Sequence, residues 1–326
     1  MGEDGAPFFD KKKDVAFAVS GKVWVNNHAH ILRSKKHVII DDFLKHILNT
    51  VSYEMHINGS TRDKLTQFSM NNIRFPLPSL REQKNIVAVL FKQTSHIDNL
   101  IKEKQTFIKL LEEKRQALIS HVVTKGLDDK VEMKDSGVEW IGKVPKHWTI
   151  GRLKHCLSIK NGQDYKDVET DDLENSFPVY GSGGIFKRAT DFLHDGESIL
   201  FGRKGTIDKP LHVNDKFWSV DTMFYSILKS TAHGRFIYCL ATTIPFKYYQ
   251  TNTALPSMTQ GDLLNNPVAF PSKKEQIEIA DFLESSNNKI DSLLAETKNS
   301  IDLLKERRSA LISAAVTGKI DVRETI

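Results

Sequence analysis

The sequence contains one segment twice, and this repeat constrains the fold more than any other feature. Residues 78–128 align without a gap with residues 271–321, at an offset of 193 residues (310 minus 117). Glu82-Gln83 returns as Glu275-Gln276, and the string Ala-Leu-Ile-Ser that begins at Ala117 returns at Ala310. Such a repeat predicts a chain built from two copies of one structural unit.

Each copy has the pattern of a long helix. Its apolar residues alternate at spacings of four and three, which is typical of a coiled-coil seam. Each helix follows a proline and runs to a stop that contains Gly126 or Gly318. With some 45 residues at about 1.5 Å each, it spans roughly 65 Å. The predicted seam consists of Ile97, Ile101, Ile108, Leu111, Arg115 and Leu118 in the first copy, and of Ile290, Leu294, Ile301, Leu304, Arg308 and Leu311 in the second.

Polar residues interrupt both seams at matching places. Arg115 corresponds to Arg308, and Lys104 corresponds to Thr297. A polar residue on a seam lowers stability but can fix the register and the pairing of helices. Two surface helices that pack separately on two cores remain an alternative.

The segment between the repeats has a different character. Runs such as SFPVYGSGG, SILFGRKGT and TMFYSIL have the pattern of short strands separated by Gly and Asp/Asn turns. Residues 1–77 echo the second half of this segment: Gly2 and Gly5 are spaced like Gly202 and Gly205, and Trp24 falls where Trp218 falls, again before a strand-like run. We therefore predict a partial domain over 1–77, a helix over 78–128, an α/β or α+β domain over 129–270, and a second helix with a tail over 271–326.

Composition narrows the functional class only slightly. The net charge of +5 and a pI near 8.9 favour an anionic partner. Cys156 and Cys239 are too few and too far apart for a disulfide framework or a zinc knuckle. No stretch approaches the roughly 18 apolar residues that a membrane span needs, so we expect a soluble, cytoplasmic protein.

Several of these motifs resemble those of type I restriction–modification specificity subunits. SGVEWIGKVPKHW at 136–148 is similar to the entry into a target recognition domain of that family. Both PxxxEQ motifs, each before a helix that ends in ALIS, resemble its conserved spacer regions. FPVYGSGGIF, LFGRKGT and FWSVDTMF resemble the interior of one recognition domain, and GEDGAPFF and WVNNHAHIL resemble the later part of another. The resemblance covers essentially the whole chain.

The resemblance implies two recognition domains separated by long helices that pair as an antiparallel coiled coil, with a pseudo-twofold internal repeat. It implies a non-catalytic subunit that binds a bipartite, asymmetric target in double-stranded DNA. The implied partners are methyltransferase subunits, two of them, and restriction–translocase subunits. S-adenosylmethionine, ATP and Mg are then expected on those partners, with no cofactor in this chain.

The chain departs from the family pattern at its start. The residues equivalent to roughly 136–200 have no counterpart before Met1. This predicts an incomplete first recognition domain. A truncated reading frame, an internal start, or a partner that supplies the missing part would each give such a sequence. The rival hypothesis is an inactive or recombination-cassette specificity protein that assembles no working complex.

No catalytic constellation is recognisable. The sequence Gly181-Ser182-Gly183-Gly184 lacks the Lys-Ser/Thr of a phosphate loop, and the segment at Asn266-Pro267 fails the (N/D)-P-P-(Y/F) pattern of a methyltransferase. His28 and His30 would share one face of a strand, but no third metal ligand lies nearby. A self-contained enzyme is therefore disfavoured, and the aromatic-rich domain disfavours a purely structural coiled coil.

DNA contact requires Arg, Lys or amide and hydroxyl side chains on accessible loops. Two groups of residues combine such side chains with flexible or strand-end positions. The candidates are Tyr180, Ser182, Lys187, Arg188, Arg203 and Lys204 in the first group, and Gln250, Asn252 and Gln260 in the second.

Overall fold

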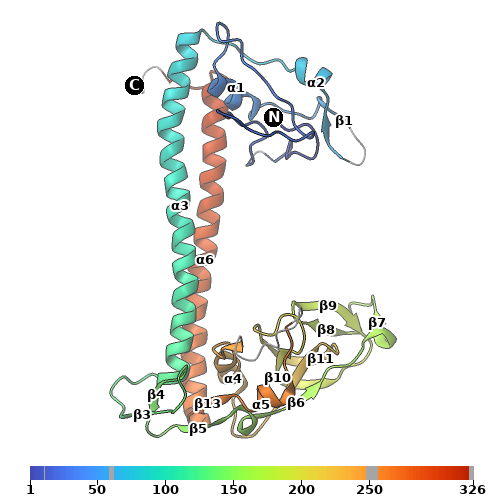
Figure 1. Cartoon of the computed structure of the whole chain (residues 1–326), viewed down its shortest axis with the longest axis vertical. Coiled ribbons are helices and arrows are strands. Elements are labelled where there is room, and N and C mark those ends of the chain that lie inside the picture. Colours follow the sequence, from blue (N-terminus) through green and yellow to red (C-terminus); the bar gives the residue numbers. More distant parts are fainter. Residues whose placement is uncertain (11, 59–61, 247–255, 323–326) are drawn as a thin grey trace. The chain divides into compact units, whose positions relative to one another are not determined.

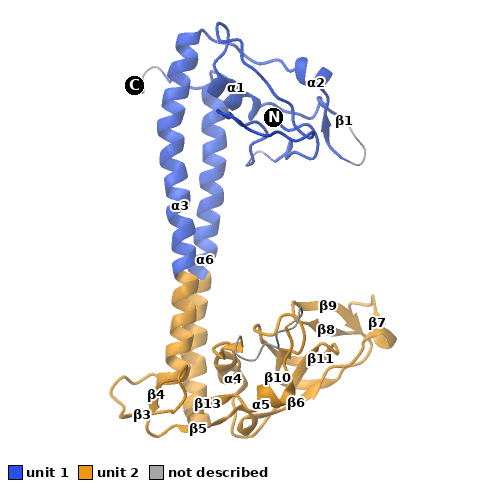
Figure 2. Ribbon diagram, viewed as in Figure 1, with its two compact units in different colours: residues 1–110, 292–326 blue, residues 111–291 orange. Residues whose placement is uncertain are grey.

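Two long helices organise the structure. The computed structural model describes residues 1–10, 12–58, 62–246 and 256–322. They form two compact units: unit 1 comprises residues 1–110 and 292–326, and unit 2 comprises residues 111–291 (Figure 2). Helix α3 (Leu80–Lys125) and helix α6 (Lys273–Val316) each contribute to both units (Figure 1). Both helices lie within the segments that the sequence predicts as helical, 78–128 and 271–326.

The same ion pair joins the two helices once in each unit. In unit 2, Arg115 of α3 binds Asp291 of α6. In unit 1, Arg308 Nε of α6 lies 2.9 Å from Asp98 Oδ1 of α3. Asp98 and Arg115 are the repeat counterparts of Asp291 and Arg308, so the pairing is antiparallel, as predicted. All twelve predicted seam residues are buried or half-buried.

Unit 2 contains a mixed sheet of seven strands, in the order β6-β12-β10-β11-β8-β9-β7. Neighbouring strands are antiparallel, except that β11 runs parallel to β8. Helix α4 (Gly234–Ala241) contacts β10 and β11 of this sheet. The strands are β6 (Leu157–Asn161), β7 (Glu169–Thr170), β8 (Phe177–Gly181), β9 (Gly184–Ala189), β10 (His194–Gly202), β11 (Leu211–Ser219) and β12 (Met223–Leu228).

Smaller elements attach this sheet to the helices. Strand β13 (Pro267–Phe270) precedes α6 and pairs with β5 (Thr149–Arg152), while β3 (Met133–Asp135) pairs with β4 (Lys143–Pro145). The short helix α5 (Gln260–Leu264) comes before β13, and 3-10 turns η1 and η2 span Leu153–His155 and Lys166–Val168. The predicted mixed domain of strands and helices is confirmed.

The repeat extends beyond the long helices into both domains. In unit 1, α1 (Asp41–Leu48) and α2 (Gln67–Asn71) start and end 193 residues before α4 and α5. Phe43 and Phe236, which occupy matching places on α1 and α4, are both fully buried. The remaining elements of unit 1 are the two-residue strands β1 (Ile57–Asn58) and β2 (Lys64–Leu65), which pair antiparallel.

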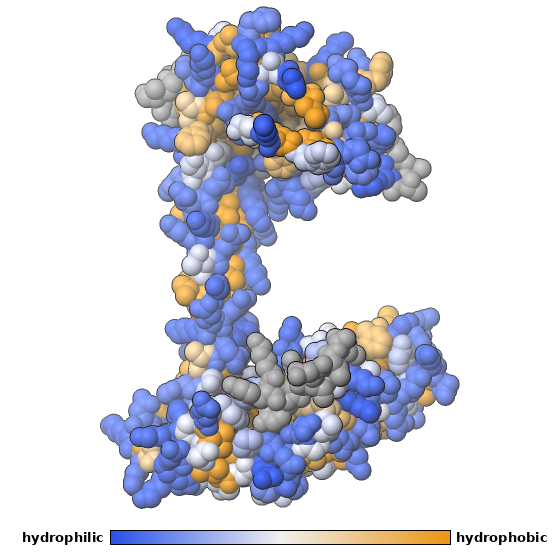
Figure 3. All heavy atoms as spheres, in the orientation of Figure 1, coloured by the Kyte–Doolittle hydropathy of each residue, from blue (hydrophilic) through white to orange (hydrophobic). Residues whose placement is uncertain are grey.

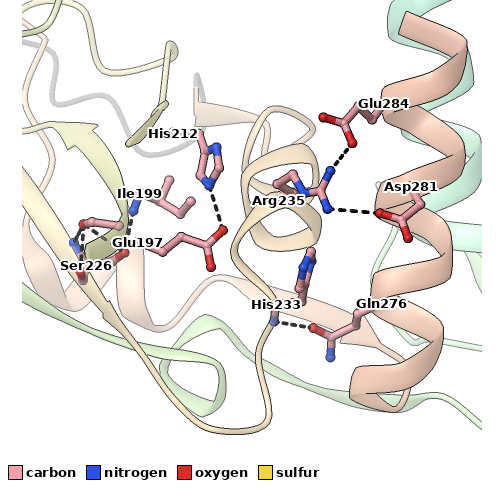
Figure 4. A network of polar contacts seen from close by, with 10 residues as sticks. Glu197, Ile199, His212, Ser226, His233, Arg235, Gln276, Asp281 and Glu284 are labelled. Atoms are coloured by element: carbon pink, nitrogen blue, oxygen red, sulfur yellow. Dashed lines mark hydrogen bonds and ion pairs between the residues drawn. The ribbon is translucent and has the colours of Figure 1, made fainter. Parts of the chain in front are cut away.

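A buried glutamine fastens each domain to its long helix. Gln276 Nε2 donates to Thr231 O at 3.1 Å and to Pro271 O at 3.0 Å, and its Oε1 accepts from His233 N at 2.9 Å. Figure 4 shows the bond to His233 beside the ion pairs of Arg235 with Asp281 and Glu284.

The repeat counterpart in unit 1 forms the same bonds. Gln83 Nε2 donates to Val38 O and Pro78 O, both at 2.9 Å, and its Oε1 accepts from Ile40 N at 3.0 Å. Both glutamine side chains are fully buried. The sequence motif Glu-Gln at the start of each helix therefore has a structural reason, because its amide satisfies three backbone groups that burial would otherwise leave unpaired.

The strand predicted after Trp24 is wrong. Residues 18–28 form no strand, and Trp24 is 98% exposed whereas Trp218 is 7% exposed. Trp218 lies on β11 between two neighbouring strands, and the described part of unit 1 contains no counterpart of β8. Figure 3 shows apolar residues at the surface of unit 1. Its large exposed apolar side chains include Phe9, Phe17, Val19, Val23, Trp24, Ile31, Met55, Phe68 and Leu77.

We predict that Gln276→Leu lowers the free energy of unfolding by at least about 2 kcal/mol, because three buried backbone groups lose their partner. Urea unfolding of the full chain measures this change. Gln116→Leu, at an exposed position of α3, is the matched control and leaves the unfolding free energy nearly unchanged. Equal values for the two variants would contradict the role of the amide.

Acid sensitivity of unit 1 follows from His46 on α1. Burial lowers the pKa of His46 from 6.5 to about 4. Below pH 6.5 the His46 imidazole is protonated in the unfolded chain but stays neutral in the folded chain. The free energy of unfolding therefore falls as the pH drops toward 4, by up to roughly 1.4 kcal/mol per pH unit. His46→Cys, which installs the counterpart residue Cys239, removes this dependence.

The pH dependence is measured by urea unfolding at about pH 7 and about pH 5. The parent chain should lose more stability between the two than His46→Cys does. His37→Ser, at an exposed histidine, is the control and should keep the parent's dependence. If the unfolding free energies of the parent chain and of His46→Cys change in parallel with pH, this explanation is wrong.

Candidate nucleic-acid interface

The turn after β10 carries two cations on a tightly held backbone. A Cβ at Gly202 would lie 2.0 Å from Thr206 O, and Gly205 has a φ of +83°, so both glycines are needed for this turn. Arg203 N donates to Thr222 O at 2.8 Å, and Met258 N donates to Arg203 O at 3.0 Å. The turn is therefore fixed between the start of β12 and the segment that leads into α5.

A pocket of about 420 Å³ opens beside this turn. Gln260 Nε2, at the start of α5, donates to Asn161 Oδ1, at the end of β6, at 2.9 Å. This bond uses one group of each amide, so the pair still offers a donor, Asn161 Nδ2, and an acceptor, Gln260 Oε1. The pocket is lined by Asn161, Arg203, Lys204, Phe224, Ser257, Met258, Thr259 and Gln260.

The charge of this pocket is positive. Lys204 is exposed, and the half-buried guanidinium of Arg203 has its carbon 5.9 Å from the centre of the Phe224 ring. Among the described residues, neither cation forms an ion pair with a carboxylate, and Arg203 Nη1 instead donates to Asp221 O at 3.4 Å. The two charges are thus available to an anionic ligand.

Unit 1 contains the same backbone hydrogen bonds as this site, but it has acidic side chains where unit 2 has basic ones. Leu65 N donates to Glu3 O at 2.7 Å, and Glu3 N donates to His28 O at 3.0 Å, which matches the two bonds of Arg203. The isolated bridge between Asp4 and Lys64 likewise matches the bridge between Lys204 and Ser257. Two carboxylates therefore occupy the places that two cations occupy in unit 2.

Neighbouring cations offset those carboxylates. Lys64 Nζ lies 3.4 Å from Glu3 Oε1, Arg62 Nη2 lies 3.6 Å from Asp4 Oδ1, and His28 Nδ1 lies 2.9 Å from Asp4 Oδ1. The matching backbone frames consequently present different chemistry to a ligand.

Three of the predicted DNA-binding residues meet in the pocket of unit 2: Arg203, Lys204 and Gln260. The prediction missed Asn161 and Phe224. Asn161 lies 99 residues from Gln260 along the chain, and no spacing or motif in the sequence links the two. Only the pairing of β6 with β12 brings Asn161 to this edge of the sheet.

The candidates on the β8–β9 hairpin lie elsewhere in unit 2. Arg188 Nε donates to Ser176 Oγ at 2.9 Å, and Lys187 forms an ion pair with Glu169. Tyr180 packs edge-on against Phe217 with ring centres 6.0 Å apart, and burial raises its pKa. Ser182 is half-buried in the hairpin turn. These contacts join the hairpin to Ser176, to β7 and to β11, and a DNA role for its residues stays a prediction.

Two further candidates, Gln250 and Asn252, lie outside the described residues. Both histidines of unit 1 bond to groups of their own domain: His28 bonds to Asp4, and His30 Nε2 bonds to Leu65 O at 2.7 Å. Over the described ranges, no group of three or more His, Cys, Asp or Glu side chains could hold a metal ion. No helix in those ranges is long and apolar enough to cross a membrane.

Comparison with known proteins identifies the family. Residues 9–110 and 145–303 match the family described as "Type I restriction modification DNA specificity domain". The MjaVIII specificity subunit of Methanocaldococcus jannaschii is 24% identical, over 93% of this chain and 76% of its own length. The MjaIX specificity subunit of the same organism is 24% identical, over 88% of this chain and 70% of its own length.

Solved structures share the fold. A chain from a study of complex assembly and conformational transition of the type I R-M system superposes with a TM-score of 0.72 at 16% identity, covering 89% of this chain and 74% of that one. The HsdS subunit of Thermoanaerobacter tengcongensis gives a TM-score of 0.53 at 17% identity, covering 89% of this chain and 73% of that one. The family match covers both domains and most of both long helices, so this chain belongs to the type I restriction–modification DNA specificity family.

Proposed function

We propose that this chain reads a bipartite, asymmetric sequence in duplex DNA and brings the modification and restriction subunits of a type I complex to it. The observation that carries this proposal is the repeated backbone frame with Arg203 and Lys204 in one unit and Glu3 and Asp4 in the other. One architecture used twice with different side chains is what two unlike half-sites require.

The pocket of unit 2 suits a DNA groove. Arg and Lys side chains bind phosphates, and Arg also binds the acceptor edge of guanine. The donor and acceptor that remain on the Asn161–Gln260 pair match the alternating donor and acceptor of an adenine edge. Cations beside paired amides therefore combine affinity with base discrimination in one place.

Unit 1 suits a different base. Carboxylates accept a hydrogen bond from the amino group of cytosine, whereas they repel phosphates. We therefore assign Glu3 and Asp4 to a base edge; Lys64, Arg62 and His28 pair with them, so they do not replace the phosphate contacts of unit 2. The two half-sites consequently differ, and the target is asymmetric.

Family membership supports a proposal for the partners. We propose that methyltransferase subunits, two of them, and restriction–translocase subunits assemble on this chain. S-adenosylmethionine, ATP and Mg then act on those subunits, and this chain contributes recognition alone.

The double variant Arg203→Ala/Lys204→Ala should weaken DNA binding about tenfold or more and reduce the slope of log affinity against log salt by about one to two. Fluorescence anisotropy with duplex DNA over a series of salt concentrations measures both quantities. Lys298→Ala, at an exposed position of α6, is the charge-matched control. An unchanged salt slope in the double variant would rule out phosphate contact at this turn.

Gln260→Ala should relax sequence preference more than it lowers affinity, because it removes a base-edge contact and leaves the cations in place. Discrimination at one base pair should fall by about 1–3 kcal/mol. Competition between the target and single-base variants measures this loss. If the affinities for the target and for all single-base variants fall by the same factor, Gln260 does not read a base.

Arg115→Glu should impair assembly with the methyltransferase subunit before it affects DNA affinity, because the helix pair loses an ion pair and gains repulsion from Asp291. Size-exclusion chromatography of the mixed subunits measures complex yield. Asp291→Arg in the same chain restores the opposite charges and should restore the yield. Equal yields for the parent chain and Arg115→Glu would refute this coupling.

A further inference from the structure

The backbone frame that the two units share continues into the short helices α2 and α5. Thr66 Oγ1 accepts from Ser69 N, and Thr259 Oγ1 accepts from Asp262 N, both at 3.1 Å. The residue before each threonine is a buried apolar residue whose N–H bonds to the matching turn of its own unit. The residue that follows each threonine therefore holds the same place in unit 1 and in unit 2.

That residue is a glutamine in both units. Gln260 lines the pocket of unit 2, where its Nε2 donates to Asn161 Oδ1 at 2.9 Å. Gln67 is its repeat counterpart, 193 residues earlier (260 minus 67). The Gln67 side chain is exposed, and its amide forms no hydrogen bond within residues 1–10, 12–58, 62–246 and 256–322. Both the donor and the acceptor of this amide therefore face solvent.

The next residue differs between the units and adds an apolar surface beside Gln67. Phe68 is 79% exposed, whereas its repeat counterpart is Gly261. Asn72 Nδ2 donates to Phe68 O at 2.8 Å, so the backbone that carries this ring is held in place. Proteins read adenine with the amide of Asn or Gln, and they read thymine by apolar contact with its methyl group. Gln67 and Phe68 combine these two kinds of contact on neighbouring residues.

The charges next to Gln67 favour a base edge over a phosphate. Glu3 O accepts from Leu65 N at 2.7 Å, two residues before Gln67. The carboxylate of Glu3 repels phosphate oxygens, and the nearest cation, Lys64 Nζ, already lies 3.4 Å from its Oε1. A neutral amide and a phenyl ring supply the hydrogen bonds and apolar contacts of base readout, whereas phosphate contacts rely mainly on cations. This place in unit 1 is therefore suited to bases.

Given the proposed function, on which this assignment rests, we propose that Gln67 and Phe68 read two adjacent A·T pairs in the half-site of unit 1. Gln67 donates to N7 of an adenine and accepts from its N6 amino group. Phe68 follows about 100° further around the helix, and it covers the methyl group of a thymine in the next pair. Both units then contact an adenine, and unit 1 alone adds the methyl contact.

The test starts from duplex DNA that the full chain selects from a random-sequence pool. Gln260→Ala changes the half-site of unit 2, so the half-site that it leaves unchanged belongs to unit 1. That half-site should contain two adjacent A·T pairs, and selection with Gln67→Ala/Phe68→Ala should lose the preference for both. Gln105→Ala/Phe91→Ala, at exposed positions of α3, is the matched control and should select the same sequence as the parent chain.

Two modified duplexes identify the atoms that are read. Replacing the adenine by 7-deazaadenine removes N7 and should weaken binding of the parent chain at least about fivefold, whereas Gln67→Ala should bind both duplexes equally. Replacing the thymine by uracil removes the methyl group and should weaken the parent about threefold, whereas Phe68→Ala should bind both equally. Fluorescence anisotropy at one salt concentration measures these affinities, after thermal unfolding has shown that each variant is folded.

The possible results separate this assignment from the proposed function. A bipartite target without A·T pairs in the half-site of unit 1, or a parent chain that binds the modified duplexes as tightly as the unmodified one, would overturn the assignment and leave the proposed function intact. Sensitivity to 7-deazaadenine that persists in Gln67→Ala would assign the adenine to another residue and overturn it as well. A full chain that selects no bipartite target would overturn the proposed function and the assignment together.

Discussion

The structure depends on one buried amide that occurs twice. Gln83 and Gln276 each lie in the first turn of a long helix, and each satisfies two backbone groups of the adjoining domain and the carbonyl of the proline before the helix. Because both amides are fully buried, the connection between domain and helix is specified by geometry as well as by apolar packing. The position of each domain on its own helix depends on these bonds.

The helix pair and the domains carry different kinds of information. The pair is symmetric, since Asp98–Arg308 and Arg115–Asp291 are the same contact made once in each unit. The domains share a backbone frame but differ in charge where Arg203 and Lys204 correspond to Glu3 and Asp4. A conserved frame with exchangeable side chains allows recognition to change without any change in how the helices pair.

The sequence alone predicted the features that depend on local pattern. The heptad spacing and the flanking prolines and glycines gave both long helices, and the duplicated motifs gave the repeat. Arg203, Lys204 and Gln260 were predicted as DNA contacts because cations and amides near glycines are common DNA contacts; the structure places them in one pocket, and their DNA role stays a prediction. The exposed run after Trp24 was mispredicted, because strand formation there needs a neighbouring strand that the residues themselves do not reveal. Asn161 was not among the predicted residues, because its place beside Gln260 depends on contacts between segments far apart in the chain.

The central claim is that two unlike readers act on one DNA. Selection of bound duplexes from a random-sequence pool by the full chain, followed by sequencing, tests it most directly. Two unlike readers should select two different half-sites at one fixed spacing, and selection with Arg203→Ala/Lys204→Ala should alter one half-site and leave the other intact. A single contiguous motif, a palindrome, or simultaneous loss of both half-sites would contradict it.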